Sequence, residues 1–180
     1  MTLAEHASTI DVLAVSGISL FPQHQGFYRR KLERGARIRI ILLNPDCAAL
    51  PIHAYQAQQP DSLIRNHIES TIAAIGQLMT HEGEGQLELR LGRNFAPFSL
   101  VGADMGKNVG RIVVEFHVYR AELDRRLHVV LDAQSQPALV DFYRGQFEAA
   151  WSISDPISAE AASAWGGRPN SSDARKESGP

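Results

Sequence analysis

The segment RIRIILL, from Arg37 to Leu43, places five isoleucine and leucine residues in seven positions. A second apolar run, from Ile10 to Val15, precedes it. Runs of this kind are typical of strands that are covered on both faces, as in the sheets of α/β folds. A helical pattern from about Gln23 to Glu33 lies between the two runs, so this part of the chain predicts a strand–helix–strand unit.

The remaining pattern extends this unit into a larger α/β fold. Further strands are expected at Leu87–Leu91, Phe98–Val101, Arg111–Phe116 and Leu127–Leu131. Two more helices are expected, one from Ser62 to Met79 with Asp61 as its cap and one from about Ser135 to Trp151. The order predicts an α/β fold with a mixed sheet and helices on both faces.

Composition supports one domain of ordinary size. The chain has 180 residues, of which 44% are hydrophobic and 21% charged, enough for a packed core. From residue 154 onward Ser, Gly, Pro, Ala and charged residues dominate. We therefore expect a domain over residues 1–153 and a disordered tail over residues 154–180.

Several classes of protein are disfavoured by charge and motif content. The formal net charge is −2, and Cys47 is the single cysteine, which excludes an internal disulfide framework and a cysteine-rich zinc site. We expect no membrane span, no secretory signal, no cofactor and a cytoplasmic protein. The G-x-S-x-G nucleophile elbow is also missing.

The turn that follows the first predicted strand is a candidate ligand site. Ser16, Gly17 and Ser19 lie in the segment VSGISLF, where an open α/β sheet binds its ligands. Their hydroxyl groups and amides could hold a small anionic or nucleotide ligand. The alternative is a tight strand-to-helix turn with no ligand.

Two further features carry charge or a titratable group. The segment from Tyr28 to Arg39 holds six basic residues and one acid, which could contact nucleic acid phosphates or form a solvated helix end. We expect Arg29, Arg30, Lys31 and Arg34 to lie around the exposed side of the helix. The seven histidines show no metal-binding spacing, and His117 either faces a cleft at a strand end or bonds to the backbone.

The chain resembles the phospholipase D-like superfamily. The resemblance rests on RGARIRIILLNPD, from Arg34 to Asp46, and on the aromatic pattern of a closing helix from Asp141 to Trp151. More narrowly, the chain is similar to small bacterial phospholipase D-like domains, some of which are fused to helix-turn-helix regulators. The resemblance covers about Ile10 to Trp151 and implies a phospholipase D-like fold.

Active members of that superfamily carry H-x-K-x-x-x-x-D, in which the histidine attacks phosphorus and the lysine binds the phosphoryl oxygens. The counterpart here is PFSLVGAD, which ends at Asp104. Pro97 then stands at the histidine position and Ser99 at the lysine position. Because neither residue can perform the motif's chemistry, the catalytic residues of the family do not carry over.

These observations leave three functions open. The first is a catalytically inactive phospholipase D-like domain that senses a ligand or binds a protein as a regulatory module. The second is a phosphodiester hydrolase with a rearranged site, using His117 with Asp104 or Lys107. The third is a nucleic-acid-binding protein that acts through the arginine-rich helix.

The resemblance also implies a homodimer, because single-motif members of the superfamily pair two half-sites across a two-fold axis. Phe95, Pro97 and Phe98 cluster near the degenerate motif. They would be a contact surface in such a dimer, or they would pack inside the monomer.

Overall fold

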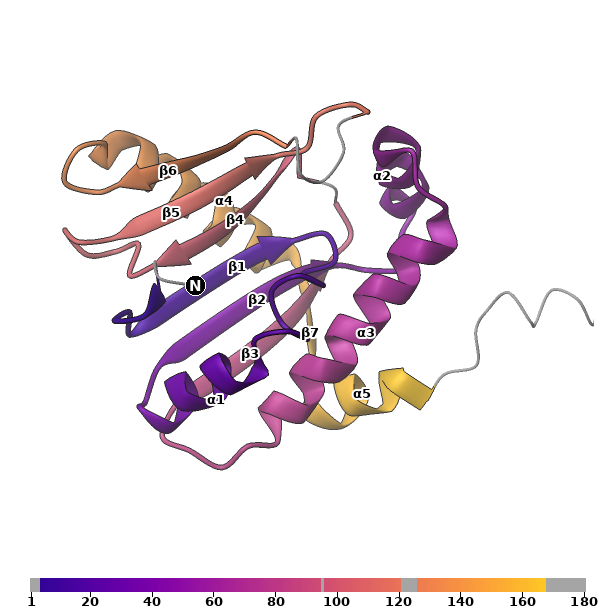
Figure 1. Cartoon of the computed structure of the whole chain (residues 1–180), viewed down its shortest axis with the longest axis horizontal. Coiled ribbons are helices and arrows are strands. Elements are labelled where there is room, and N and C mark those ends of the chain that lie inside the picture. The colour runs from indigo at the N-terminus through magenta and orange to yellow at the C-terminus, as the bar shows by residue number, and fades with distance from the viewer. Residues whose placement is uncertain (1–3, 95, 121–125, 168–180) are drawn as a thin grey trace, which may run out of the picture.

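The computed structural model describes residues 4–94, 96–120 and 126–167. Helices separate the first three strands, and antiparallel strands follow (Figure 1). In chain order the elements are β1 (Thr9–Ala14), α1 (Gln25–Glu33), β2 (Arg37–Leu43), α2 (Ala49–Ala57), α3 (Asp61–Met79), β3 (Gln86–Gly92), β4 (Phe98–Ala103), β5 (Arg111–Phe116), β6 (His128–Asp132), α4 (Pro137–Ile153), β7 (Asp155–Ile157), α5 (Ala159–Ser163) and the 3₁₀ helix η3 (Ala164–Gly167).

The strands form one mixed sheet in the order β6-β5-β4-β1-β2-β3-β7. β1, β2 and β3 run parallel. β4, β5 and β6 extend the sheet beyond β1 as antiparallel neighbours, and β7 pairs antiparallel with β3 at the opposite edge. The predicted α/β class with a mixed sheet is therefore confirmed.

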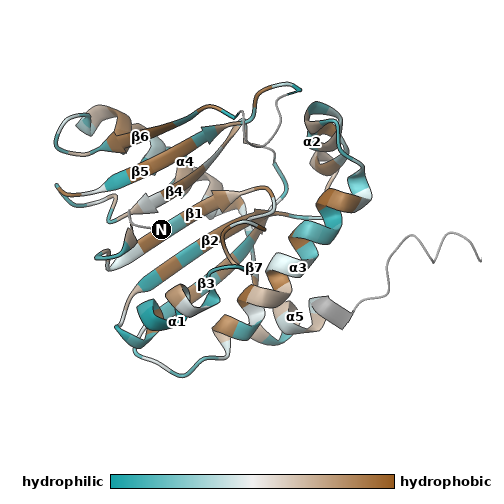
Figure 2. Ribbon diagram, in the orientation of Figure 1, coloured by the Kyte–Doolittle hydropathy of each residue, from teal (hydrophilic) through white to brown (hydrophobic). Residues whose placement is uncertain are grey.

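Helices cover the two faces of the sheet unequally. On one face α1, α2, α3 and α5 pack over β1, β2 and β3 (Figure 1). On the other face α4 packs through Val140, Phe147 and Trp151 against side chains from the middle of the sheet. Figure 2 shows hydrophobic residues along the central strands, in keeping with their burial between these two layers.

The long helix α3 follows from its isoleucine spacing. Ile64, Ile68, Ile72 and Ile75 are all at most 3% exposed and face the sheet, as the repeat of three or four residues predicts. The expected cap at Asp61 is wrong by one position. Pro60 is the N-cap, and Asp61 is the first helical residue, where a carboxylate is favourable beside the positive end of the helix dipole.

The expected disordered tail from residue 154 is wrong for residues 154–167. β7 pairs with β3 through Ile157 and Leu89, while Ala162 and Trp165 are buried in the core that contains α3. Few apolar side chains suffice here because the segment docks on an existing surface. The rest of the expected tail, residues 168–180, lies outside the described residues, so the boundary at 153 divides a continuous fold.

Helix α2 is absent from the sequence-based prediction. Its nine residues include Pro51 and lack a clear apolar stripe, so no periodicity indicates it. Leu50 and Ala54 nevertheless pack in the core, and His53 is 5% exposed. None of the described helices combines the length and apolar character that crossing a membrane requires.

Candidate functional site

A cavity of about 260 Å³ lies at the carboxyl end of β1, next to the first residues of β4. Three parts of the fold surround it: the turn after β1, the helices α2 and α3, and the uncovered side of β4 and β5. Its polar lining consists of Ser16, Ser19, His53, Gln59, His67, Ser99, Glu115, His117 and Arg126. Its apolar lining includes Val15, Ile18, Ile64, Val101 and Val113.

The turn after β1 brings its backbone close to this cavity. Gly17 has φ of +62°, a conformation that favours glycine, and a Cβ there would lie 3.2 Å from Leu42 Cδ2. The amides of Leu20 and Phe21 both donate to the Gly17 carbonyl. The segment is thus a tight turn, and the same turn places Ser16, Gly17 and Ser19 in the cavity wall.

His117, directly after β5, has a defined orientation at the cavity. Its Nδ1 lies 3.0 Å from the Ala96 carbonyl oxygen, and its Nε2 lies 2.9 Å from Ser99 Oγ. Because a carbonyl oxygen only accepts, Nδ1 carries the proton and Nε2 accepts from the Ser99 hydroxyl. Burial lowers the pKa of His117, so the ring is neutral at pH 7.

His53 is a site residue that the sequence did not indicate. It comes from α2, and its ring centroid lies 5.4 Å from that of His117 with the rings edge to face. Burial is the main cause that lowers the pKa of His53 to about 4, with smaller contributions from the neighbouring His117 and Arg126. No sequence pattern points to His53, because α2, the helix that carries it, has no apolar periodicity.

One ion pair supplies charge at the cavity. Arg126 Nη1 donates to Glu115 Oε1 at 3.0 Å, and the Arg126 side chain is 12% exposed. Glu115 neutralises the guanidinium group, and His53 and His117 are uncharged at pH 7. The site therefore offers directed hydrogen bonds rather than a strongly charged surface.

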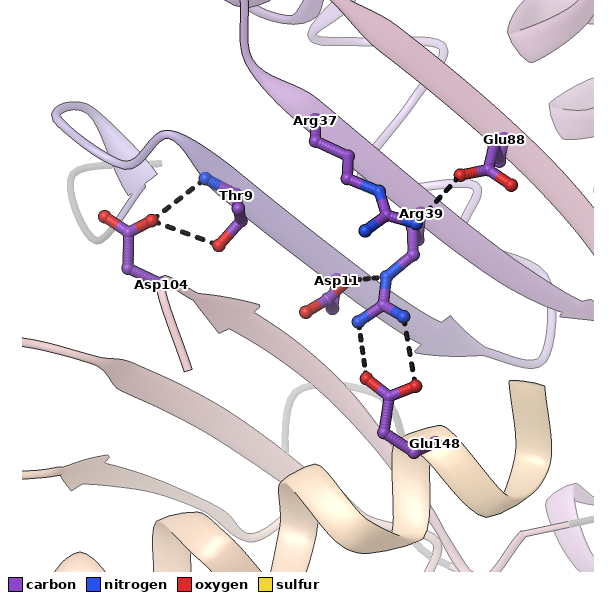
Figure 3. A network of polar contacts seen from close by, with 7 residues as sticks. All are labelled: Thr9, Asp11, Arg37, Arg39, Glu88, Asp104 and Glu148. Atoms are coloured by element: carbon purple, nitrogen blue, oxygen red, sulfur yellow. Dashed lines mark hydrogen bonds and ion pairs between the residues drawn. The ribbon is translucent and has the colours of Figure 1, made fainter. Parts of the chain in front are cut away.

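Asp104 and Lys107 lie at the opposite end of β4. Asp104 Oδ1 accepts from Thr9 N at 2.9 Å, Thr9 Oγ1 at 3.0 Å and Ser8 Oγ at 3.0 Å, and Figure 3 shows its bonds to Thr9. Lys107 Nζ lies 3.1 Å from the same carboxylate oxygen. These bonds to backbone, hydroxyl and ammonium groups hold the pKa of Asp104 below its usual range despite burial.

The expected pairing of His117 with Asp104 or Lys107 is therefore wrong. Ser99 contacts His117 at the first end of β4, and Asp104 follows its last residue. A strand advances about 3.3 Å per residue, so roughly 17 Å separate Ser99 from Asp104. The antiparallel pairing of β4 with β1 places Asp104 beside the start of β1 and Ser99 beside its carboxyl end.

Three of the four basic residues expected on the exposed side of the helix, Arg29, Arg30 and Arg34, are exposed, and the expectation is wrong only for Lys31. Lys31 is 6% exposed, and its ammonium group donates to the carbonyls of Glu5 and Ala7. Arg37 pairs with Glu88 at 3.2 Å. Arg29, Arg30 and Arg34 are exposed on or directly after α1, which is largely hydrophilic in Figure 2.

Arg39 joins the sheet to α4 (Figure 3). Its guanidinium group donates to Asp11 at 2.6 Å and contacts both oxygens of Glu148, at 2.7 and 3.1 Å. The same group lies over the rings of Phe147 and Trp151. A bidentate pair of this kind is structural and takes Arg39 out of any basic surface.

Within the described part of the chain, no group of three or more His, Cys, Asp or Glu residues could hold a metal ion. No protein-family model and no curated protein matches the chain. The fold is similar to that of TrmBL2, an archaeal chromatin protein described as showing a novel mode of DNA binding, with a TM-score of 0.47 and 15% identity. The match covers 87% of this chain and 48% of that chain, so the chain spans about half the length of its match.

Proposed function

We propose that the chain is a phospholipase D-like domain that binds a small molecule in the cavity beside Ser99 and acts as a ligand-sensing regulatory module. The observation that carries the proposal is the cavity itself. It lies at the carboxyl end of a parallel strand, where α/β sheets bind ligands. Polar side chains from three separate parts of the fold line it.

The placement of the degenerate motif supports the phospholipase D-like assignment. The segment from Pro97 to Asp104 covers β4, which lies inside the sheet between β5 and β1. Asp104 supports the start of β1 through hydrogen bonds, whereas the positions held by Pro97 and Ser99 lie at the cavity end. In this proposal the supporting aspartate remains, and the two groups needed for phosphodiester chemistry are gone.

The lining defines the class of ligand. The volume of about 260 Å³ is below the usual range of about 300–1,000 Å³ for drug-sized ligands, so the cavity suits a small metabolite better than a nucleotide. One side is apolar and the other offers the hydroxyl and imidazole groups of Ser99 and His117. We propose a ligand with a short apolar part and a polar head of low charge.

A binding screen tests the proposal. Thermal melting of the full chain should rise with a member of a panel of short-chain acids, esters, amides and sugars. Val113→Phe, in the cavity wall, should abolish the shift. Val109→Phe is the control, because Val109 is 62% exposed in the turn before β5 and is not among the residues that line the cavity. The absence of any stabilising compound, or an equal shift in both variants, would overturn the proposal.

A second measurement examines the lost chemistry. The chain should not hydrolyse bis-p-nitrophenyl phosphate above the buffer rate, because Pro97 replaces the nucleophilic histidine. A phosphohistidine trapped on the protein would contradict this expectation.

Nucleic acid binding is the weaker alternative, since three of the six basic residues between Tyr28 and Arg39 bond within the fold, namely Lys31, Arg37 and Arg39. Salt-dependent binding to a DNA duplex through Arg29, Arg30 and Arg34 would restore it.

The homodimer implied by the resemblance is proposed with a different contact surface. Phe98 packs against the ring of Tyr143 in the monomer, with centroids 5.2 Å apart, and Phe95 lies outside the described residues. Instead, Val101, Val113 and Val130 form a row across β4, β5 and β6 that begins in the cavity wall and ends at Val130, which is 58% exposed.

Light scattering tests this dimer directly. At micromolar concentration it should give twice the mass of one chain, and Val130→Asp should reduce this to one. Val109→Asp is the control, because Val109 is 62% exposed in the turn before β5. A monomeric wild-type chain would rule the dimer out.

A further inference from the structure

Ser99 and His117 form a hydrogen-bonded pair within the cavity. Ser99 is the second residue of β4, His117 follows the last residue of β5, and both line the cavity. The Oγ–Nε2 distance is 2.9 Å. A serine hydroxyl and an imidazole within this distance can act as nucleophile and general base, provided that the imidazole is correctly protonated and oriented.

The environment of His117 meets both conditions. The Ala96 carbonyl accepts from Nδ1 at 3.0 Å, which fixes the ring and leaves the lone pair of Nε2 directed at the serine hydroxyl. Burial keeps the imidazole neutral at pH 7, so the base is ready to accept a proton. The Ala96 carbonyl thus orients the imidazole, as a carboxylate does in a three-residue catalytic triad.

The other cavity walls define what such a pair could attack. Val15, Ile18 and Ile64 provide an apolar wall suited to a short acyl chain. Arg126 lines the same cavity, and its guanidinium group carries several N–H donors in addition to the one bound to Glu115. A guanidinium N–H donor near the reacting carbonyl would stabilise, through a hydrogen bond, the negative charge that develops on its oxygen.

We infer that Ser99 is a nucleophile and His117 its general base in the hydrolysis of small carboxylic esters. This rests on the proposed ligand cavity and is independent of the phospholipase D-like resemblance. Ser99 Oγ bonds to the acyl carbon while its proton passes to His117 Nε2. The bond between that carbon and the alcohol oxygen then breaks, and His117 gives the proton to the departing alcohol.

Water completes the reaction. It attacks the acyl-serine carbon and gives a proton to His117, the bond to Ser99 Oγ breaks, and that oxygen recovers the proton. The products are one carboxylic acid and one alcohol, and no oxidant or reductant is needed. The arrangement differs from the nucleophile elbow because Ser99 lies within a strand, which explains why no G-x-S-x-G sequence accompanies it.

Covalent labelling provides the test. Diisopropyl fluorophosphate should modify the full chain once, and peptide mapping should locate the modification at Ser99. Ser99→Ala should remove the label and the hydrolysis of p-nitrophenyl butyrate, and His117→Gln should slow both at least 100-fold, as loss of a general base does. Ser152→Ala, on the exposed side of α4, should change neither rate.

Two further measurements separate the possible failures. In Ser99→Cys, iodoacetamide should alkylate position 99 faster when His117 is present than in the double variant with His117→Gln, which identifies the base even if Ser99→Ala folds poorly. Stabilisation by a cavity ligand without any label at Ser99 would overturn this inference and leave the proposed function intact. Absence of both would overturn both.

Discussion

The polar side chains at the two ends of β4 have different roles. At the Asp104 end, the carboxylate accepts hydrogen bonds from Ser8 and Thr9 and pairs with Lys107. At the Ser99 end, the hydroxyl and the imidazole of His117 line a cavity. The comparison shows that one strand can use its polar side chains for the fold at one end and present them to a ligand at the other.

The largest effect should come from Arg39, which joins Asp11 of β1, the strand whose start Asp104 supports, to Glu148 of α4 (Figure 3). Arg39→Met leaves Asp11, which is 5% exposed, without its ion-pair partner. We expect the free energy of unfolding to fall by about 4 kcal/mol, the usual range for breaking a buried pair. Urea unfolding measures the loss.

A double-mutant cycle with Asp11→Leu sharpens this result. The double variant should be more stable than Arg39→Met alone, because it removes the unpaired buried carboxylate. Additive losses of stability would mean that the Asp11–Arg39 ion pair contributes no interaction energy to the fold.

The next effect belongs to the cavity end and depends on pH. The pKa of His53 is about 4 in the folded chain, against about 6.5 when unfolded. The unfolded chain therefore binds a proton first, and stability falls as pH drops from about 6.5 to 4. The shift corresponds to about 3 kcal/mol.

Urea unfolding at pH 7 and at pH 4 measures this dependence. His53→Gln should remove the part that His53 contributes, about 3 kcal/mol, whereas His128→Gln, at an exposed position of β6, should leave the dependence unchanged. An unchanged pH dependence in His53→Gln would mean that the charge of His53 is tolerated in the folded state.

Asp104 should show a smaller and chemically specific loss. Asp104→Ala removes the acceptor of several hydrogen bonds at a residue with φ of +50°, which should lower stability by about 2 kcal/mol. Asp104→Asn keeps an acceptor and tolerates this φ, so it should lose less. Because the pKa of Asp104 lies below its usual value, its stabilisation is present above about pH 4 and disappears as pH falls through the folded pKa. Equal losses for both variants would indicate that charge alone matters.

The smallest effect should come from Lys107. Its side chain is 51% exposed, and exposed ion pairs contribute at most about 1 kcal/mol. Lys107→Ala should therefore change the urea midpoint only slightly, and 1 M salt should reduce the difference further. A large loss would show that the Asp104 end needs its cation as well as its backbone donors.

The sequence predicts the fold best where periodicity is strong. The isoleucine spacing of α3 and the apolar run of β2 indicate elements that the structure confirms. The segment of β7 and α5 was misinterpreted because composition describes what a segment can bury by itself. Gly76 of α3 shows why composition alone is insufficient. A Cβ there would lie 2.6 Å from Ser163 N, so the absence of a side chain on Gly76 leaves room for the last segment to pack against α3.

The candidate site could be predicted only in part. Ser16, Gly17 and His117 were identified individually, because the ends of strands are places where side chains reach a ligand. The partner predicted for His117 is wrong, because β4 carries Asp104 to the opposite end of the strand from Ser99 and His117. Ser99 was interpreted only as a lost lysine, and its bond to His117 depends on strand pairing that no local pattern reveals.

The pairing of β7 with β3 has a consequence for how the chain matures on the ribosome. β3 is synthesised more than sixty residues before β7. Its outer edge and the groove at Gly76 therefore stay exposed until β7 and α5 have been synthesised. An open strand edge invites pairing with other chains. A chain released after residue 153 would thus expose the edge of β3 and be prone to aggregation. The short final segment prevents this because β7 covers that edge.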